Sequence, residues 1–392
     1  ITDTDIFTDQ LALTGKFKTG SILHKFNIGA EYSDQESNKG SYATSYPGYK
    51  DTTTGGFNSN CANADAWCTS LTHPNSHDAW LGSHIANRDT TTTTTKTTSV
   101  YALNNIEFTP QWLLDLGVRW DKFDTEQVTN ATNETIENNK DFFTYQAGLT
   151  FKPRENGAIY ASYATSANPV GVDAGDGSES IGKAYMDLKP EEARTIELGT
   201  KWDLLQDRLN LTAAIFRTEK QNTRIQLDAG TYTNGGESKV DGVELTANGK
   251  ITDKWDITAG YSYLDSEMTN PGPSCNRQGV CTPENPAKGK QLPNVPENSA
   301  TLWSTYRVLP QFTVGAGAFY ADKVYGDAAN TKWVSSYVRY DAMARYDVNK
   351  QVNVQLNVNN LSDKRYFTKA YASHYATEAD GRNAVLSLNF KY

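Results

Sequence analysis

The stretch "QVNVQLNVNNLSDKRY" (residues 351–366) alternates apolar and polar side chains without a break from Val352 to Asn359. Successive side chains of a β-strand point to opposite faces, so this period of two predicts a strand with one apolar and one polar face. The alternation alone leaves open whether the apolar face meets a soluble core or lipid. The rest of the chain decides between the two.

The same alternation recurs along the chain. "WLLDLGVRW" (112–120) and "YVRYDAMARYDV" (337–348) place aromatic and aliphatic side chains on one face and Arg and Asp side chains on the other. Gly, Pro, Asn and Asp residues mark tight turns between successive strands, which therefore pair as seven predicted hairpins. The hairpins span 7–34, 98–126, 142–165, 192–219, 238–267, 298–323 and 336–359. A last strand at 382–392 brings the predicted number to about fifteen.

The connections between these strands are of two kinds, tight turns and long polar segments. The long segments include 35–97, 166–191, 220–237, 268–297 and 360–381. Short turns at one end and long loops at the other are typical of bacterial outer-membrane barrels, whose strands turn apolar side chains toward lipid. A soluble β-sandwich, the main alternative, has shorter strands, and a β-helix would show a fixed short repeat. The pattern predicts an all-β fold over residues 1–392, a transmembrane antiparallel β-barrel in which Val352 to Val358 face lipid.

The bulk composition agrees with this prediction. The 392 residues carry a net charge of −9 and have a mean hydropathy of −0.62. No stretch approaches the roughly 18 consecutive apolar residues of a transmembrane helix, and a barrel keeps its mean hydropathy low because its two faces alternate. The acidic balance argues against nucleic acid as a partner. Because there is no nucleophile–base arrangement and no Gly-rich phosphate loop, we predict that the chain is not an enzyme.

The predicted strand number is odd, whereas single-chain bacterial barrels normally have an even number. An open sheet would expose unpaired backbone groups to lipid, which is not viable. The chain also starts in strand-like sequence without a signal peptide. We therefore expect it to be the C-terminal part of a barrel whose first strands precede residue 1.

The four cysteines form two close pairs, Cys61 with Cys68 and Cys275 with Cys281, in polar segments. Their spacing fits neither a zinc site nor a redox Cys-x-x-Cys motif well, and free thiols are the remaining alternative. We predict two short-range disulfides, formed in an oxidising compartment such as the periplasm or the cell surface. Each would stabilise its loop by roughly 2–3 kcal/mol.

Five stretches of the chain resemble TonB-dependent outer-membrane receptors, in particular their catecholate ferric-siderophore branch. They are "LKPEEARTIELGTKWDLLQDRLNLTAAIFRTEKQNTR" (188–224), "GGESKVDGVELTANGKITDKWDITAGYSYLDSE" (235–267), "LPNVPENSATLW" (292–303), "NVNNLSDKRYF" (357–367) and "GRNAVLSLNFKY" (381–392). They occur in the same order as in the family, over more than half of the chain. Residues 1–165 show the same succession of strands, turns and loops but carry fewer distinctive motifs.

The resemblance implies a 22-stranded barrel around an N-terminal plug, in which these fifteen strands would be the eighth to the twenty-second. The plug and the box that contacts TonB are expected to be absent from this sequence. The resemblance further implies a monomer in the outer membrane of a Gram-negative bacterium, surrounded by lipid. Its partners would be a ferric siderophore and the TonB–ExbB–ExbD complex, reached through the absent part, with iron carried as cargo and no cofactor.

A ferric tris-catecholate is anionic and aromatic, so Arg, Lys and aromatic side chains of the outer loops are the expected contacts. The candidates are Trp67, Trp80, Arg224, Tyr232, Tyr325, Lys332, Trp333, Arg365, Tyr371, His374 and Tyr375. For each of them the alternative is a residue that only packs its loop or an interfacial girdle.

Three histidines, His73, His77 and His84, are clustered in the first long segment. No carboxylate or cysteine set completes a metal site there, so no metal site is predicted. Two further functions compete with siderophore import. One is a receptor of the same fold for cobalamin, haem or a glycan, and the other is a passive channel or a surface adhesion barrel.

Overall fold

The computed structural model of the chain describes residues 2–45, 77, 83–170, 187–228, 231–275, 280–371 and 375–391. These residues form one fifteen-stranded antiparallel sheet and three small two-stranded sheets. No helix of the described ranges has the length and hydropathy that a membrane crossing would require. The predicted all-β fold and the predicted strand number are confirmed.

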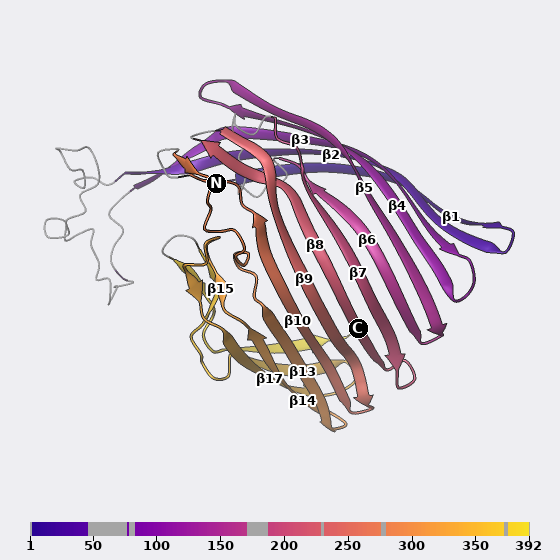
Figure 1. The fold of residues 1–392 in the computed structure, drawn as a ribbon. Helices are drawn as coiled ribbons and strands as arrows, with labels where there is room; N and C mark the ends of the chain where they lie inside the picture. Colours follow the sequence, from indigo (N-terminus) through magenta and orange to yellow (C-terminus); the bar gives the residue numbers. More distant parts are fainter. Residues whose placement is uncertain are drawn as a thin grey trace.

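The strands of the large sheet lie in chain order, each hydrogen-bonded to the next. They are β1 (Thr2–Thr19), β2 (Ile22–Ser45), β3 (Ser83–Glu107), β4 (Trp112–Thr129), β5 (Glu134–Arg154), β6 (Gly157–Asn168), β7 (Glu191–Leu204), β8 (Leu209–Asp228), β9 (Thr231–Thr252), β10 (Trp255–Asn270), β13 (Asn298–Leu309), β14 (Phe312–Ala321), β17 (Tyr337–Asp347), β18 (Val352–Asn359) and β21 (Asn383–Phe390). They build a curved, twisted wall, and the edge strands β1 and β21 are not paired with each other within the described ranges (Figure 1).

The small sheets are hairpins inside three of the long connections. They are β11 (Ser274–Cys275) with β12 (Cys281–Thr282), β15 (Val324–Tyr325) with β16 (Trp333–Val334), and β19 (Phe367–Ala370) with β20 (Ala376–Glu378). The tight turns lie at one end of the wall, and β15 lies at the other (Figure 1). All long connections therefore leave the sheet at the same end, as the sequence predicts.

The strands extend further into the loop end than predicted. Segment 220–237, expected to be a loop, is mostly strand, because β8 runs to Asp228 and β9 starts at Thr231. Strands β2 and β3 likewise continue beyond the predicted hairpins. Polar side chains bridge these strands: Thr92 Oγ1 donates to Asn38 Oδ1 at 2.7 Å. The prediction was wrong here because both faces are polar beyond the apolar band, so alternation no longer marks the strand.

The stretch 351–366 forms β18 and the segment that follows it. Leu356 lies directly between Ala344 of β17 and Leu386 of β21, and Leu356 and Leu386 are 40% and 71% exposed. On the opposite face, Asn389 Nδ2 donates to Asn353 Oδ1 at 3.0 Å. A strand with an exposed apolar face and a hydrogen-bonded polar face is the arrangement of a barrel wall with lipid outside.

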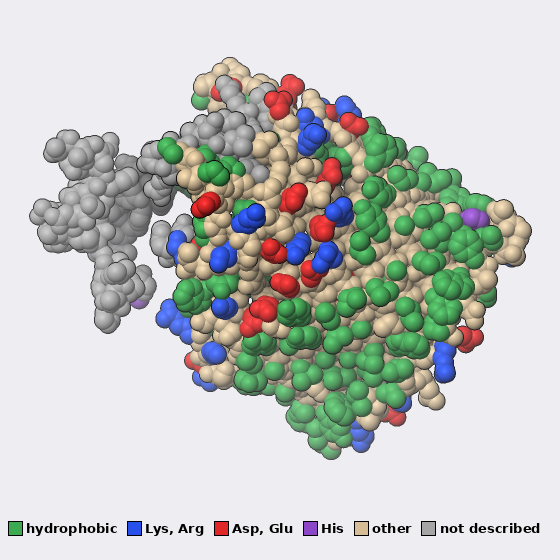
Figure 2. Space-filling model, viewed as in Figure 1, with side chains coloured by type: hydrophobic (Ala, Val, Ile, Leu, Met, Phe, Trp, Pro, Cys, Tyr) green, Lys and Arg blue, Asp and Glu red, His purple; other side chains and the backbone are tan. Residues whose placement is uncertain are grey.

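The apolar face has a sharp boundary toward the loop end. Figure 2 shows the apolar side chains as a broad band, with charged side chains gathered between this band and the loops. Three cross-strand ion pairs of β7–β10 lie on this face: Arg194–Glu219, Arg217–Asp241 and Lys239–Glu267. Charges are costly inside the hydrocarbon region. The ion pairs therefore mark the height at which the wall leaves the bilayer.

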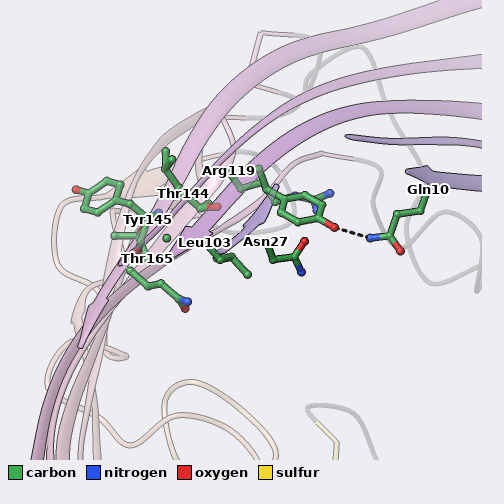
Figure 3. Close-up of a pocket in the computed structure, with 11 residues that line it drawn as sticks. Gln10, Asn27, Leu103, Arg119, Thr144, Tyr145 and Thr165 are labelled. Atoms are coloured by element: carbon green, nitrogen blue, oxygen red, sulfur yellow. Dashed lines mark hydrogen bonds between the residues drawn. The ribbon is translucent and has the colours of Figure 1, made fainter. Parts of the chain in front are cut away.

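The opposite, polar face carries a network on β1–β4. Arg119 donates from Nε to Asp121 Oδ1 at 2.8 Å and from Nη2 to Ser99 Oγ at 2.7 Å, and Ser99 is fully buried. Gln10 Nε2 donates to the Tyr101 hydroxyl at 3.0 Å beside a pocket of about 420 Å³ (Figure 3). Because these charge-assisted hydrogen bonds satisfy the guanidinium, the free-energy cost of holding the Arg119 charge on this face is small.

Glycine is required at position 29, where β2 passes under a tyrosine of β3. A Cβ at Gly29 would lie 2.4 Å from the Tyr101 hydroxyl oxygen. We expect Gly29→Ala to displace Tyr101 and to lower the free energy of unfolding by about 1–3 kcal/mol. The measurement is thermal unfolding of the purified protein in detergent. Gly148→Ala is the matched control, because a Cβ there has no neighbour closer than 3.8 Å; equal shifts in the two variants would contradict the steric argument.

Candidate ligand-binding site

Three long connections lie together at the loop end of the wall. They are 271–297 after β10, 322–336 after β14 and 360–382 after β18, and we refer to them as the loop cluster. Within it, β19 packs against both β15 and β16. Residues far apart in the sequence therefore meet on one surface.

Two asparagines with left-handed backbone conformations join these connections. Asn294 (φ 57°) donates from its amide to the Tyr325 carbonyl at 2.8 Å, and its side-chain Oδ1 accepts from the Ala370 amide at 3.0 Å. Asn330 (φ 58°) exchanges two side-chain hydrogen bonds of 2.9 Å with the backbone of Gln291. Asparagine tolerates this conformation better than most residues. Each asparagine thus links one loop to another.

A third asparagine closes the last loop. Asn360 (φ 52°) is 1% exposed, and its side chain accepts from the Lys364 amide at 2.9 Å and donates to the Asp380 carbonyl at 3.2 Å. Its own amide donates to Asp341 Oδ1 of β17 at 2.9 Å. This one side chain therefore holds the beginning and the end of the loop together.

Cations lie over aromatic rings at three places in the loop cluster. The pairs, with the distance from the charged group to the ring centre, are Lys323–Tyr325 (5.0 Å), Arg365–Phe367 (5.7 Å) and Lys369–Tyr371 (5.1 Å). In each pair the residues are two positions apart, which places both side chains on one face of an extended segment. The cluster therefore offers positive charge and aromatic surface together.

Two aromatic side chains of the cluster are open to solvent. Trp333 is 60% exposed and lies opposite Tyr325 in the β15–β16 hairpin. Tyr375 is 57% exposed, and its ring centre is 4.4 Å from that of Tyr371. Exposed aromatic rings supported by packed neighbours can stack on a planar ligand.

Arg365 is engaged by the protein itself. Its guanidinium donates from Nε and Nη2 to the two carboxylate oxygens of Glu378, at 2.6 and 3.1 Å. This cation lowers the pKa of the Glu378 carboxyl. The pair joins the two ends of the β19–β20 hairpin, while the Arg365 side chain remains 75% exposed.

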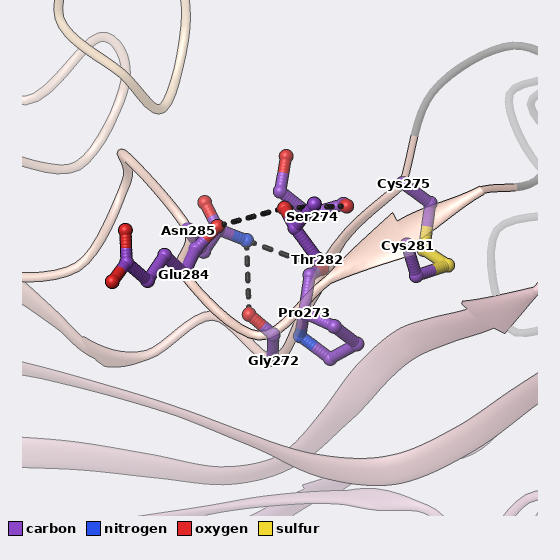
Figure 4. The surroundings of a disulfide bond; sticks show 8 residues. All are labelled: Gly272, Pro273, Ser274, Cys275, Cys281, Thr282, Glu284 and Asn285. Carbon is purple, nitrogen blue, oxygen red and sulfur yellow. Dashed lines mark hydrogen bonds between the residues drawn. A yellow bond between two sulfur atoms is a disulfide. The ribbon is translucent and has the colours of Figure 1, made fainter.

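A disulfide closes the β11–β12 hairpin, as predicted. Cys275 and Cys281 are bonded at an S–S distance of 2.04 Å (Figure 4). Next to it, Asn285 Nδ2 donates to the Gly272 carbonyl at 3.0 Å and so fixes the base of the loop. The other predicted pair, Cys61 with Cys68, lies outside the described residues.

The comparisons with known proteins agree with this architecture. The family described as "TonB dependent receptor-like, beta-barrel" matches residues 1–361. The chain belongs to this family. The chain is located in the outer membrane of a Gram-negative bacterium.

Several TonB-dependent receptors are similar over the whole chain. The "Probable TonB-dependent siderophore receptor PiuA" of Acinetobacter baumannii is 62% identical over 399 residues, which cover 100% of this chain and 53% of PiuA. The "Catecholate siderophore receptor Fiu" of Escherichia coli K12 is 30% identical, with coverages of 99% and 51%. The crystal structure of PiuA superposes with a TM-score of 0.92 at 61% identity, covering all of this chain and 56% of that one. The chain thus spans about half the length of these relatives.

The predicted contact residues fall into three groups in this TonB-dependent receptor. Those that the loop cluster brings together are Tyr325, Lys332, Trp333, Arg365, Tyr371 and Tyr375. Arg224 and Tyr232 lie instead in β8 and β9, where Tyr232 pairs with Gln226 and only its backbone is described. Trp67, Trp80 and His374 lie outside the described residues.

Sequence reasoning missed the cations Lys323 and Lys369 and the three joining asparagines. The signal for the cations is a basic residue two positions before an aromatic one, which occurs four times in the loop cluster and places the cation over the ring in three of them. The asparagine contacts span up to 76 residues and leave no local signal. Within the described ranges, no group of three His, Cys, Asp or Glu side chains is placed to hold a metal ion; His73 lies outside them.

The tip of the β15–β16 hairpin depends on an ionised carboxylate. Asp327 accepts from the Thr331 hydroxyl at 2.6 Å and from the Thr331 and Lys332 amides at 2.9 Å. Burial alone would raise the pKa of Asp327, but these hydrogen bonds outweigh it, so its pKa is lowered.

A lowered folded-state pKa means that this stabilisation is present above the ordinary carboxyl pKa and is lost as the pH falls through the lowered value. We expect proteolysis near the hairpin tip to accelerate only in that acidic range. Asp327→Asn should show the fast cleavage already at pH 7, because its amide has a single oxygen and its nitrogen cannot accept the hydrogen bond that the second carboxylate oxygen accepts. A pH-independent cleavage rate in the unchanged protein would contradict this expectation.

Proposed function

We propose that this chain is the C-terminal wall of an outer-membrane receptor that binds a ferric siderophore, of the catecholate type, and imports it by TonB-dependent transport. The observation that carries the proposal is the 62% identity to a TonB-dependent siderophore receptor over the full length of this chain. The iron is cargo, and no resident cofactor is part of the proposal.

The loop cluster supports the catecholate assignment by its chemistry. Trp333 and Tyr375 are exposed, Lys332 precedes Trp333 in the chain, and Lys369 lies over the ring of Tyr371, which packs against Tyr375. An anionic ligand with flat aromatic rings would gain both charge attraction and stacking from such a surface. The 30% identity to a catecholate siderophore receptor supports the same ligand class.

Energy coupling is proposed on the ground of family membership. An N-terminal plug inside the barrel would supply the contact with TonB–ExbB–ExbD, the first strands of the barrel would follow the plug, and the receptor would act as a monomer. The unpaired edges of β1 and β21 support this arrangement, because unpaired backbone groups are not tolerated in lipid.

Uptake measurements test the proposal. A strain that lacks the gene, with all other siderophore receptors also deleted, would be supplied with radioactive iron bound to catecholate, hydroxamate or citrate ligands. Restoring the full-length gene should restore uptake of the ferric catecholate alone. That uptake should stop when the proton-motive force is collapsed, because TonB coupling depends on it.

Two results would overturn the proposal. Equal uptake of every ferric siderophore with and without the gene would exclude siderophore import. Restored uptake that survives collapse of the proton-motive force would indicate a passive channel. Cobalamin and haem in the same assay would reveal a receptor for another ligand.

A further inference from the structure

The apolar face of the wall is not uniformly filled between β1 and β5. Two hollows of about 520 and 690 Å³ lie there. Both are lined by Ile28, Ala102 and Val118, which are direct neighbours across β2, β3 and β4. The two hollows therefore form one continuous groove, which we call the β3 groove.

The groove is centred on Ala102, whose methyl group lies between the larger side chains of Ile28 on β2 and Val118 on β4. Ala102 is the middle of its floor. On one side stand Leu13 and Ile28, and on the other stand Val118 and Trp120. At 3.4 Å per residue, the floor from Val100 to Asn104 is about 14 Å long, which is close to half of the hydrocarbon thickness.

Aromatic rings bound the groove at both ends. Trp120 and Phe143 lie at the end nearer the loops, and Phe17 and Phe26 lie at the end nearer the tight turns. The Trp120 indole donates to Asp141 Oδ2 at 3.2 Å, so its polar edge is turned toward the charged zone. Aromatic residues with this orientation mark the height of lipid headgroups.

We infer that the β3 groove holds one acyl chain of a membrane lipid in a defined position. The groove is continuous with the lipid-facing band, so lipid is the solvent that it opens to. Its width selects among apolar occupants: the backbones of β2 and β4 are about 10 Å apart, and their side chains occupy part of that distance. An α-helix needs about 10–12 Å with its side chains, whereas a single hydrocarbon chain fits.

This inference depends on the outer-membrane location of the chain and not on the ligand that the receptor imports. A defect in lipid retention and a defect in iron uptake are therefore separate results. The expected property is that a lipid stays bound through detergent extraction, because an acyl chain in the groove makes van der Waals contacts with its floor and both walls that a chain on the open band lacks.

The test is native mass spectrometry of the full-length receptor extracted from outer membranes and washed until bulk lipid is removed. The unchanged protein should retain a lipid. Ala102→Phe fills the floor of the groove and should abolish that retention. Ala316→Phe is the matched control, since Ala316 lies on the same face of β14, outside the groove, and should retain lipid like the unchanged protein.

Ala102→Leu is a second, smaller obstruction in case the phenylalanine variant does not reach the membrane, and it should reduce lipid retention at least severalfold. Retention equal to that of the unchanged protein in either Ala102 variant would overturn the inference. So would an unchanged protein that retains no lipid, or one that retains a polypeptide in its place.

Discussion

Replacing Asn360 with alanine is expected to release the last outer loop, 360–382, from the wall. The substitution removes three part-buried hydrogen bonds from the Asn360 side chain to backbone groups of Lys364 and Asp380, at about 0.5–1.5 kcal/mol for each. It also forces alanine into a left-handed conformation at a further 1–2 kcal/mol, roughly. A total of about 3 kcal/mol or more corresponds to ~100-fold faster cleavage of the loop in limited proteolysis.

Two variants separate the causes of this effect. Asn360→Gly loses the same hydrogen bonds but accepts the positive φ without strain, so it should be cleaved more slowly than the alanine variant. Asn389→Ala removes an exposed side-chain hydrogen bond to Asn353 on the wall and should leave the cleavage rate unchanged. Cleavage of Asn360→Ala at the rate of the unchanged protein would refute the closing role of this residue.

Removing both exposed rings of the loop cluster, Trp333→Ala with Tyr375→Ala, is expected to weaken binding of a ferric catecholate by ~100-fold. Each stacking or cation–π contact contributes about 1–2 kcal/mol, so two contacts account for about 3 kcal/mol. Titration calorimetry with the full-length receptor measures this loss. The single variant Trp333→Phe, with Tyr375 unchanged, should keep most of the affinity of the unchanged protein, because an aromatic ring remains at position 333.

The matched control is Trp255→Ala at the opposite end of the wall, where the indole donates to Ser304 Oγ at 2.8 Å. It removes a similarly large exposed ring and should leave the affinity for the ligand unchanged. A double variant that unfolds at the normal temperature and binds normally would show that the ligand contacts another part of the receptor.

The wall could be predicted from the sequence because one physical rule acts along all of it. In the lipid region a strand has a dry and a wet face, so Val352, Val354 and Leu356 reveal both the strand and its orientation. Beyond the bilayer both faces are wet, and threonine and asparagine replace the alternation. The extension of β8 through Arg224 to Asp228 was therefore missed.

The candidate site was predictable only in its residue types. Aromatic and basic residues in the loops favour a surface for an anionic aromatic ligand, which stays a prediction, and Tyr325, Trp333 and Tyr371 lie together in the loop cluster. Their assembly depends on Asn294 and Asn330, whose partners lie in other loops. Such contacts are set by tertiary geometry, and a single sequence contains no periodic trace of them.

The asparagine bridges also have a consequence for building receptors with new ligand ranges. The bridges that Asn294 and Asn330 make between loops fall within residues 271–382, and the first loop is held in addition by backbone hydrogen bonds to Met268 of β10. A chimaera that receives the whole segment from a relative should keep the loops in place. A chimaera that receives a single loop would lose the partners of Asn294 or Asn330, so the natural unit of exchange is the segment of three loops with the strands between them.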